Sequence, residues 1–97
     1  MSYQLIFTPG QTEPVKTPRE KQPKLEEMQQ AVGGYIQMAC QVKVDGLLAQ
    51  VWVDEEGLLK GKPINVPLML WLTQLGYRGQ AFVGPALVLV GKKALAT

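Results

Sequence analysis

The dipeptide Asp45-Gly46 constrains the fold more than any other feature of the sequence, because it separates two segments with strand-like alternation. A two-residue loop of this kind favours a type I′ turn, whose twist matches that of the strands on either side. Residues 35–44 precede the turn and residues 47–53 follow it. In the second segment, alternate residues form two faces: Ala49, Val51 and Val53 on one, and Leu48, Gln50 and Trp52 on the other. The sequence therefore predicts an antiparallel β-hairpin.

Two segments of the first third of the chain predict a strand and a helix. Residues 3–8 are rich in β-forming side chains and end at Pro9-Gly10, a pattern typical of a strand followed by a turn. Pro23 then precedes residues 24–32, in which apolar side chains recur at spacings of three and four. The pair Gly33-Gly34 is expected to end this helix, since glycine readily takes the left-handed conformation at a helix terminus.

The second half of the chain predicts another helix and a last β-region. Asn65 is a good N-cap for a helix over residues 66–75, and Gly76 is expected to end that helix. Residues 58–60 are interpreted as a short additional strand before it. Residues 81–90 form the last β-region, with an interruption where glycine and proline adjoin.

The predicted order is β-α-β-β-(β)-α-β, which defines an α+β fold: a small, mainly antiparallel sheet with two short helices packed on it. A chain of 97 residues is expected to form a single domain, residues 1–97. Residues 11–22 contain two prolines, several charges and one aliphatic side chain, and are interpreted as a flexible loop. Residues 92–97 are interpreted as a tail.

The sequence has no histidine and a single cysteine, Cys40, and these two facts exclude much of enzyme chemistry. They rule out Ser-His-Asp and Cys-His catalysis, histidine-ligated and cysteine-clustered metal sites, and an internal disulfide. We therefore expect no catalytic residue, no metal and no cofactor, and we interpret the protein as a non-enzyme.

Ten basic and eight acidic side chains give a net charge of +2, well short of the basic field that dominates nucleic-acid binding. The basic side chains concentrated in residues 16–24 are expected to be solvated, with weak nucleic-acid binding through this segment as an alternative. No apolar run approaches the roughly 20 residues that span a bilayer, and no secretory signal is visible. A cytoplasmic protein, without membrane contact, is therefore expected.

Three segments, residues 24–36, 53–65 and 82–87, carry motifs whose order is familiar. The motifs are Leu25-Glu26-Glu27-Met28-Gln29-Gln30-Ala31-Val32-Gly33-Gly34-Tyr35-Ile36, Asp54-Glu55-Glu56-Gly57, Gly61-Lys62-Pro63-Ile64-Asn65 and Gly84-Pro85-Ala86. In this order the chain resembles a family of small uncharacterised proteins from phages, bacteria and archaea, known only as a domain of unknown function. The resemblance covers most of the chain from Pro23 to Val90. It implies a phage-like or mobile-element context and a cytoplasmic location, in the host if the protein is phage-encoded.

The sequence departs from the family pattern in two places. Pro85 stands where the family has a polar residue in its last strand, and the helix after Asn65 is more apolar than the family pattern suggests. Any function that used a polar group at position 85 is therefore in doubt. The resemblance brings no known activity and no catalytic residues.

The apolar helix suggests a contact surface. Because residues 68–72 are apolar all round, this helix must be buried on more than one side, either by the chain itself or by another protomer. We expect the contact to use Leu68, Met69, Trp71 and Leu72, with a polar rim of Asp54, Glu55 and Glu56. Together with the phage-like context that the resemblance implies, this surface suggests an accessory protein of phage type that self-associates and binds and modulates a host component, such as a host protein.

An alternative function, of a different class, is the sequestration of a small anionic, nucleotide-like ligand. Gly33, Gly34 and Tyr35 would bring backbone N–H groups close to the ligand, with Arg78 nearby. A phosphate cradle normally places its glycines before a helix rather than after it, so a helix C-cap is the simpler interpretation of the two glycines.

Overall fold

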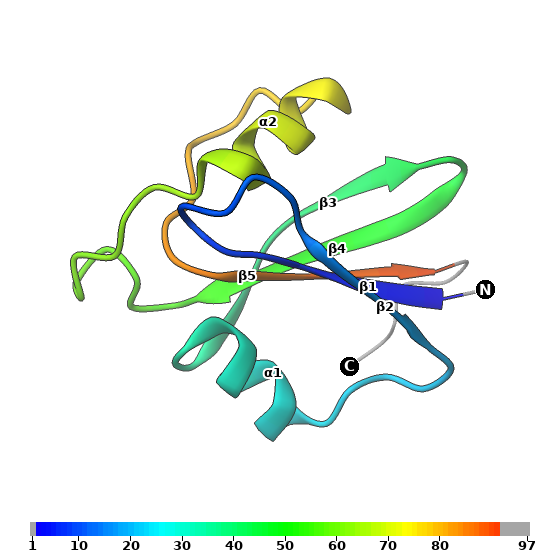
Figure 1. Ribbon diagram of the computed structural model, residues 1–97, viewed down its shortest axis with the longest axis horizontal. Coiled ribbons are helices and arrows are strands. Elements are labelled where there is room, and N and C mark those ends of the chain that lie inside the picture. Colours follow the sequence, from blue (N-terminus) through cyan, green and yellow to red (C-terminus); the bar gives the residue numbers. More distant parts are fainter. Residues whose placement is uncertain (1, 92–97) are drawn as a thin grey trace.

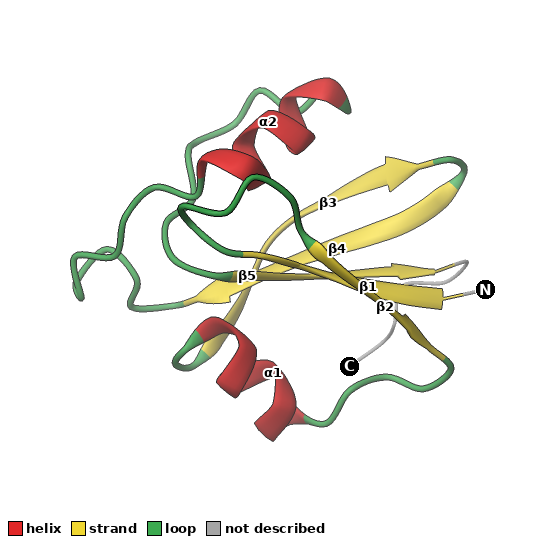
Figure 2. Cartoon of the chain, in the orientation of Figure 1, coloured by secondary structure: helices red, strands yellow, loops and turns green. Residues whose placement is uncertain are grey.

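A computed structural model of the chain describes residues 2–91. The strands are β1 (Ser2–Phe7), β2 (Val15–Arg19), β3 (Ile36–Val44), β4 (Leu47–Asp54) and β5 (Ala86–Gly91), and the helices are α1 (Leu25–Val32) and α2 (Val66–Gln74). All strands pair antiparallel in one sheet of order β2-β1-β5-β4-β3. The two helices lie on opposite faces of this sheet, giving three layers (Figures 1 and 2). The predicted α+β fold is confirmed.

The predicted hairpin is present as β3 and β4, joined at Asp45 and Gly46, both of which have positive φ. The two faces of β4 bury different clusters, as the alternation predicted. Ala49, Val51 and Val53 face α2, in a core cluster with Leu5, Phe7, Leu68, Leu72, Phe82, Ala86, Val88 and Val90. Trp52 faces α1, in a second cluster with Met28, Val32, Leu87 and Leu89. The central strands are therefore packed on both sides, which explains why β5 is buried along its whole length.

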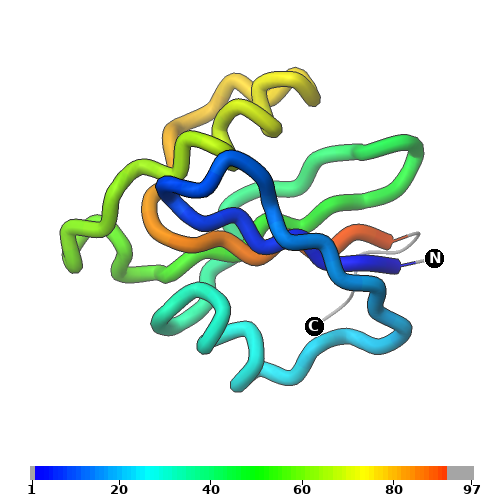
Figure 3. The backbone as a smooth tube through the Cα atoms, in the orientation of Figure 1, coloured from blue at the N-terminus to red at the C-terminus, as the bar shows by residue number. Residues whose placement is uncertain are grey.

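Chain segments that are distant in sequence meet at the centre of the sheet. β5 lies between β1 and β4, so the start of the chain pairs with its last described strand (Figure 3). β3 and β2 are left at the two edges.

The interpretation of residues 11–22 as a flexible loop is wrong, because β2 lies inside that range and pairs with β1. Its side chains are mostly exposed, so no burial pattern marks it in the sequence. Pro18 is tolerated because an edge strand has a neighbour on one side only. Residues 58–60 are turn rather than strand, and of residues 81–83 only Val83 pairs, in an isolated bridge with Ile64. The predicted tail, residues 92–97, lies outside the described residues.

Asn65 joins three parts of the fold. Its side-chain Oδ1 accepts a hydrogen bond from the backbone N–H of Leu68 at 3.2 Å, which caps α2. Its Nδ2 donates to the carbonyl oxygen of Phe7 at 2.9 Å and to that of Gly84 at 2.8 Å. Asn65 is fully buried, so one amide fixes the start of α2 against the end of β1 and the approach to β5.

Among residues 2–91, no helix is long and apolar enough to cross a membrane.

Candidate functional site

Residues of three of the four motifs, those of residues 25–36, 54–57 and 61–65, meet at the C-terminal end of α1. Asp54, the last residue of β4, has a fully buried side chain, and its Oδ2 lies 2.8 Å from Lys60 Nζ and 2.7 Å from Lys62 Nζ. Lys62 Nζ also donates to the carbonyl oxygen of Val32 at 2.9 Å, and Lys60 Nζ donates to that of Gly33 at 3.3 Å. The two ammonium groups therefore sit at the negative end of the α1 dipole, where cations are stabilising.

The two glycines are explained by this arrangement. Gly33 has φ of 80° and ends α1 in the left-handed conformation, with its N–H donating to the Gln29 carbonyl oxygen. A Cβ on Gly34 would lie 2.5 Å from Asp54 Oδ1, so only glycine fits against this carboxylate. A Cβ on Gly33 would meet Lys62 Nζ at 2.9 Å. The space beside both glycines is filled by the chain's own Asp54 and Lys62.

The environment of Asp54 fixes its charge. Burial by itself raises the pKa of the Asp54 carboxyl, but hydrogen bonds from Lys60, Lys62 and the backbone N–H of Glu56 outweigh it and hold the pKa well below its usual range. The hydrogen bond to Asp54 in turn raises the pKa of Lys60. The carboxylate is thus ionised, and both of its oxygens accept hydrogen bonds from within the chain. These bonds join β4, the turn that follows it and α1.

The residues predicted for the ligand site do not share one location. Gly33 and Gly34 belong to the Asp54 cluster, and Tyr35 is exposed beside it. Arg78 follows α2, which packs on the opposite face of the sheet from α1 (Figure 1).

The predicted polar rim is divided between core and surface. Glu55 and Glu56 are exposed, whereas Asp54 is buried and paired, so it is not available as part of a rim. Within the described chain, no group of three or more acidic or cysteine side chains is placed to hold a metal ion.

The predicted apolar contact residues are also divided. Leu68 and Leu72 are fully buried in the core, so they cannot contribute to a contact surface. Met69 and Trp71 are partly buried, and the Trp71 ring packs on that of Phe7 with centroids 5.2 Å apart. The outward side of α2 is instead formed by Val66 and Leu70. The predicted helix is thus apolar all round, yet it is covered on one side only.

Sequence reasoning missed these exposed aliphatic residues. Val66 is 55% exposed and Leu70 is 62% exposed, and Ile64, just before the helix, is 55% exposed. The spacing of four residues places Val66 and Leu70 on the opposite side of the helix from Leu68 and Leu72, but both pairs are apolar, so the sequence does not indicate which pair faces outward. From Pro63 to Tyr77 the chain has no charged residue, so α2 itself presents an uncharged outer side.

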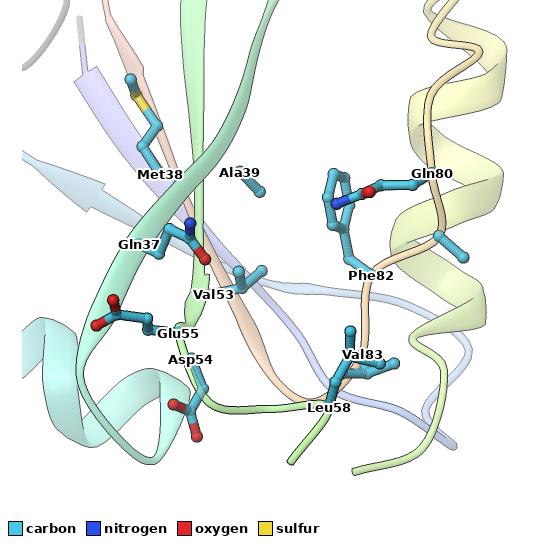
Figure 4. Close-up of a pocket in the computed structure, with 11 residues that line it drawn as sticks. Gln37, Met38, Ala39, Val53, Asp54, Glu55, Leu58, Gln80, Phe82 and Val83 are labelled. Carbon is cyan, nitrogen blue, oxygen red and sulfur yellow. The ribbon is translucent and has the colours of Figure 1, made fainter. Parts of the chain in front are cut away.

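A cavity of about 140 Å³ lies on the α2 side of the sheet, beside the first half of β3. Gln37 and Ala39 from β3 stand on one side of it, and Gln80 and Phe82 from the segment before β5 on the other (Figure 4). Leu58 and Val83 close one end, and Glu55 and the exposed edge residue Met38 also line it. Sequence reasoning did not predict this cavity, because its two walls are more than 40 residues apart in the chain.

The fold is that of a small α+β protein, and in it the motif residues Asp54 and Lys62 hold the end of β4 against the end of α1. The family model described as "Domain of unknown function (DUF3846)" matches residues 4–94, and the chain belongs to this family. A search of curated proteins found no match, and a search of solved structures found none.

Proposed function

We propose that the protein is a non-enzymatic accessory protein of phage type that self-associates through the outer face of α2 and binds a host component. One observation carries the self-association: a neutral helix exposes Val66 and Leu70 on the side opposite its buried face, with Ile64 beside them. Exposed aliphatic groups gathered on one side of a small domain are typical of interaction surfaces.

A second copy of the same chain is the partner that fits this face best. Two identical neutral faces can pack about a two-fold axis without leaving a buried charge unpaired on either side. A stable dimer commonly buries about 800 Å² per partner, roughly an eighth of this chain's surface of 6086 Å². The outer side of α2, together with Ile64, provides the apolar centre of such an area.

Sedimentation velocity of the wild-type protein over a range of concentrations tests the proposal. We expect a dimer for the wild type and a monomer for Leu70→Glu, since a glutamate at the centre of the contact would be buried without a partner. Leu59→Glu is the matched control, because Leu59 is 86% exposed but lies in the turn after β4, away from α2. Circular dichroism establishes that each variant is folded.

Two results would contradict the proposal. A wild-type protein that stays monomeric at several hundred micromolar, well above the Kd of a typical stable dimer, has no self-association to explain. A Leu59→Glu variant that dissociates while Leu70→Glu does not would place the contact on the turn instead of on α2.

A further inference from the structure

The two edges of the sheet differ in how they are protected. β2 is five residues long and carries Pro18, Lys16 and Arg19, all of which discourage pairing with another strand. β3 is nine residues long, contains no proline and has Lys43 as its one charged residue. Its protection is limited to this lysine and to one β-bulge between Met38 and Cys40, so most of this long edge is a template for an added strand.

The cavity beside β3 lies where an added strand would place its side chains. The β3–β4 register shifts between Met38 and Cys40, so that Ala39 is an extra residue at the edge. Gln37 and Ala39 line the cavity, which is on the α2 face of the sheet. A strand paired to the β3 edge alternates its side chains between the two faces, so every second side chain would point to this face.

We propose that the β3 edge and this cavity bind an extended segment of a protein partner, which adds a strand to the sheet and inserts one apolar side chain into the cavity. The inference rests on the proposed function only in that the component bound is a protein. The cavity of about 140 Å³ has room for a leucine or valine side chain, and its lining is mixed, with Gln37, Gln80 and Glu55 among the polar residues. Phe82 and Val53 supply apolar lining, and exposed Met38 and Leu58 extend it at the rim.

The charges around the cavity specify the partner further. Glu55 lines the cavity and Glu56 adjoins it, and both are exposed. Asp54 also lines the cavity, but its carboxylate is paired with two lysines and points away from the cavity (Figure 4). Asp54, Glu55 and Glu56 carry three negative charges against the two positive charges of Lys60 and Lys62, so the net charge at this end is −1. The segment that binds therefore carries a lysine or arginine at the end that reaches Glu55.

Nuclear magnetic resonance titration tests this inference with a defined probe. The protein is ¹⁵N-labelled Leu70→Glu, used so that self-association through α2 does not enter the measurement. The probe is the synthetic peptide Lys-Thr-Val-Thr-Leu-Thr-Val, capped at both ends. We expect saturable shifts confined to the amides of residues 36–44 and 80–83, with a Kd of about 0.1–1 mM, as befits a generic sequence.

Peptide and protein variants identify the mode of binding. A probe with proline in place of its central threonine is expected to bind at least tenfold more weakly, because proline cannot donate to the β3 edge. Ala81→Trp, at an exposed residue that lines the cavity, is expected to weaken binding of the original probe by a similar factor. Val15→Trp is the matched control on the other edge of the sheet, and is expected to bind as the parent does.

The inference is overturned if no saturable shift occurs up to about 5 mM peptide, or if the proline probe binds as well as the original. It is also overturned if the shifts at β3 follow protein concentration instead of peptide concentration, because the edge then belongs to a second copy of this chain. These outcomes are independent of the sedimentation result, so failure of either proposal leaves the other open to its own test.

Discussion

Replacing Asn65 by aspartate is expected to destabilise the protein strongly, although aspartate caps helices as well as asparagine does. The aspartate keeps the oxygen that accepts from the Leu68 N–H. It lacks the amide hydrogens that satisfy the buried carbonyl oxygens of Phe7 and Gly84, and it places a negative charge against both. Leaving a buried polar group unsatisfied costs about 1–3 kcal/mol, so the two carbonyl groups together account for about 4 kcal/mol.

The comparison with Asn65→Ala separates capping from the other hydrogen bonds. The alanine variant loses the same two donated bonds and also the cap, which is worth about 1 kcal/mol. We therefore expect the free energy of unfolding at pH 7 to fall by about 4–5 kcal/mol for Asn65→Ala, and by at least as much for Asn65→Asp because of its buried charge. Gln74→Glu, the same chemical change at the exposed last residue of α2, is expected to cost no more than about 1 kcal/mol, because there it opposes only the helix dipole.

Urea denaturation followed by circular dichroism measures these differences, and the pH dependence sharpens the test. Burial next to two carbonyl oxygens raises the pKa of an aspartate at position 65 above its unfolded value, so Asn65→Asp is expected to regain stability relative to wild type as the pH falls. The protonated carboxyl then donates one of the lost hydrogen bonds. An Asn65→Asp variant within about 1 kcal/mol of wild type at pH 7 would refute the reasoning.

Two further predictions concern the Asp54 cluster. The folded-state pKa of Asp54 lies below its unfolded value of about 3.9, so its contribution to stability is complete above about pH 5 and is lost as the pH falls further. In a series of acid denaturation measurements, the free energy of unfolding of Asp54→Asn is therefore expected to depend less on pH than that of the wild type. Gly34→Ala is expected to cost about 1–3 kcal/mol in urea denaturation and clearly less in an Asp54→Ala background, because the added Cβ meets that carboxylate. Equal costs in the two backgrounds would show that the contact with Asp54 is not the reason for the glycine.

Much of the fold could be predicted because it depends on local signals. The Asp45-Gly46 turn and the alternation on either side predicted the central hairpin and the correct face for Ala49, Val51, Val53 and Trp52. Asn65 was predicted as the cap of α2 from its residue type and position. The Gly33 C-cap followed from a glycine at the end of an apolar stripe. In each of these cases the deciding contacts lie within a few residues along the chain.

The candidate surfaces were predicted less well, because they depend on which side of an element the rest of the chain covers. Residues 68–72 are uniformly apolar, so the sequence could not indicate that Leu68 and Leu72 face the sheet while Leu70 faces outward. Asn65 sets the position of α2 on the sheet through hydrogen bonds to Phe7, 58 positions before it in the chain, and to Gly84, 19 positions after it. The acidic run 54–56 was likewise treated as one exposed turn, although its first residue is buried.

The sequence by itself determined the α+β class, the central hairpin and the exclusion of histidine- and cysteine-based chemistry, since these follow from composition and local spacing. Tertiary structure alone decided that β2 forms, since its exposed side chains give no pattern and its backbone pairs with β1 from a distance. It alone brought Asp54, Lys60 and Lys62 to the end of α1, and β3 to the cavity wall opposite Phe82. Those arrangements arise from pairing and burial between segments far apart in the chain, which no local pattern encodes.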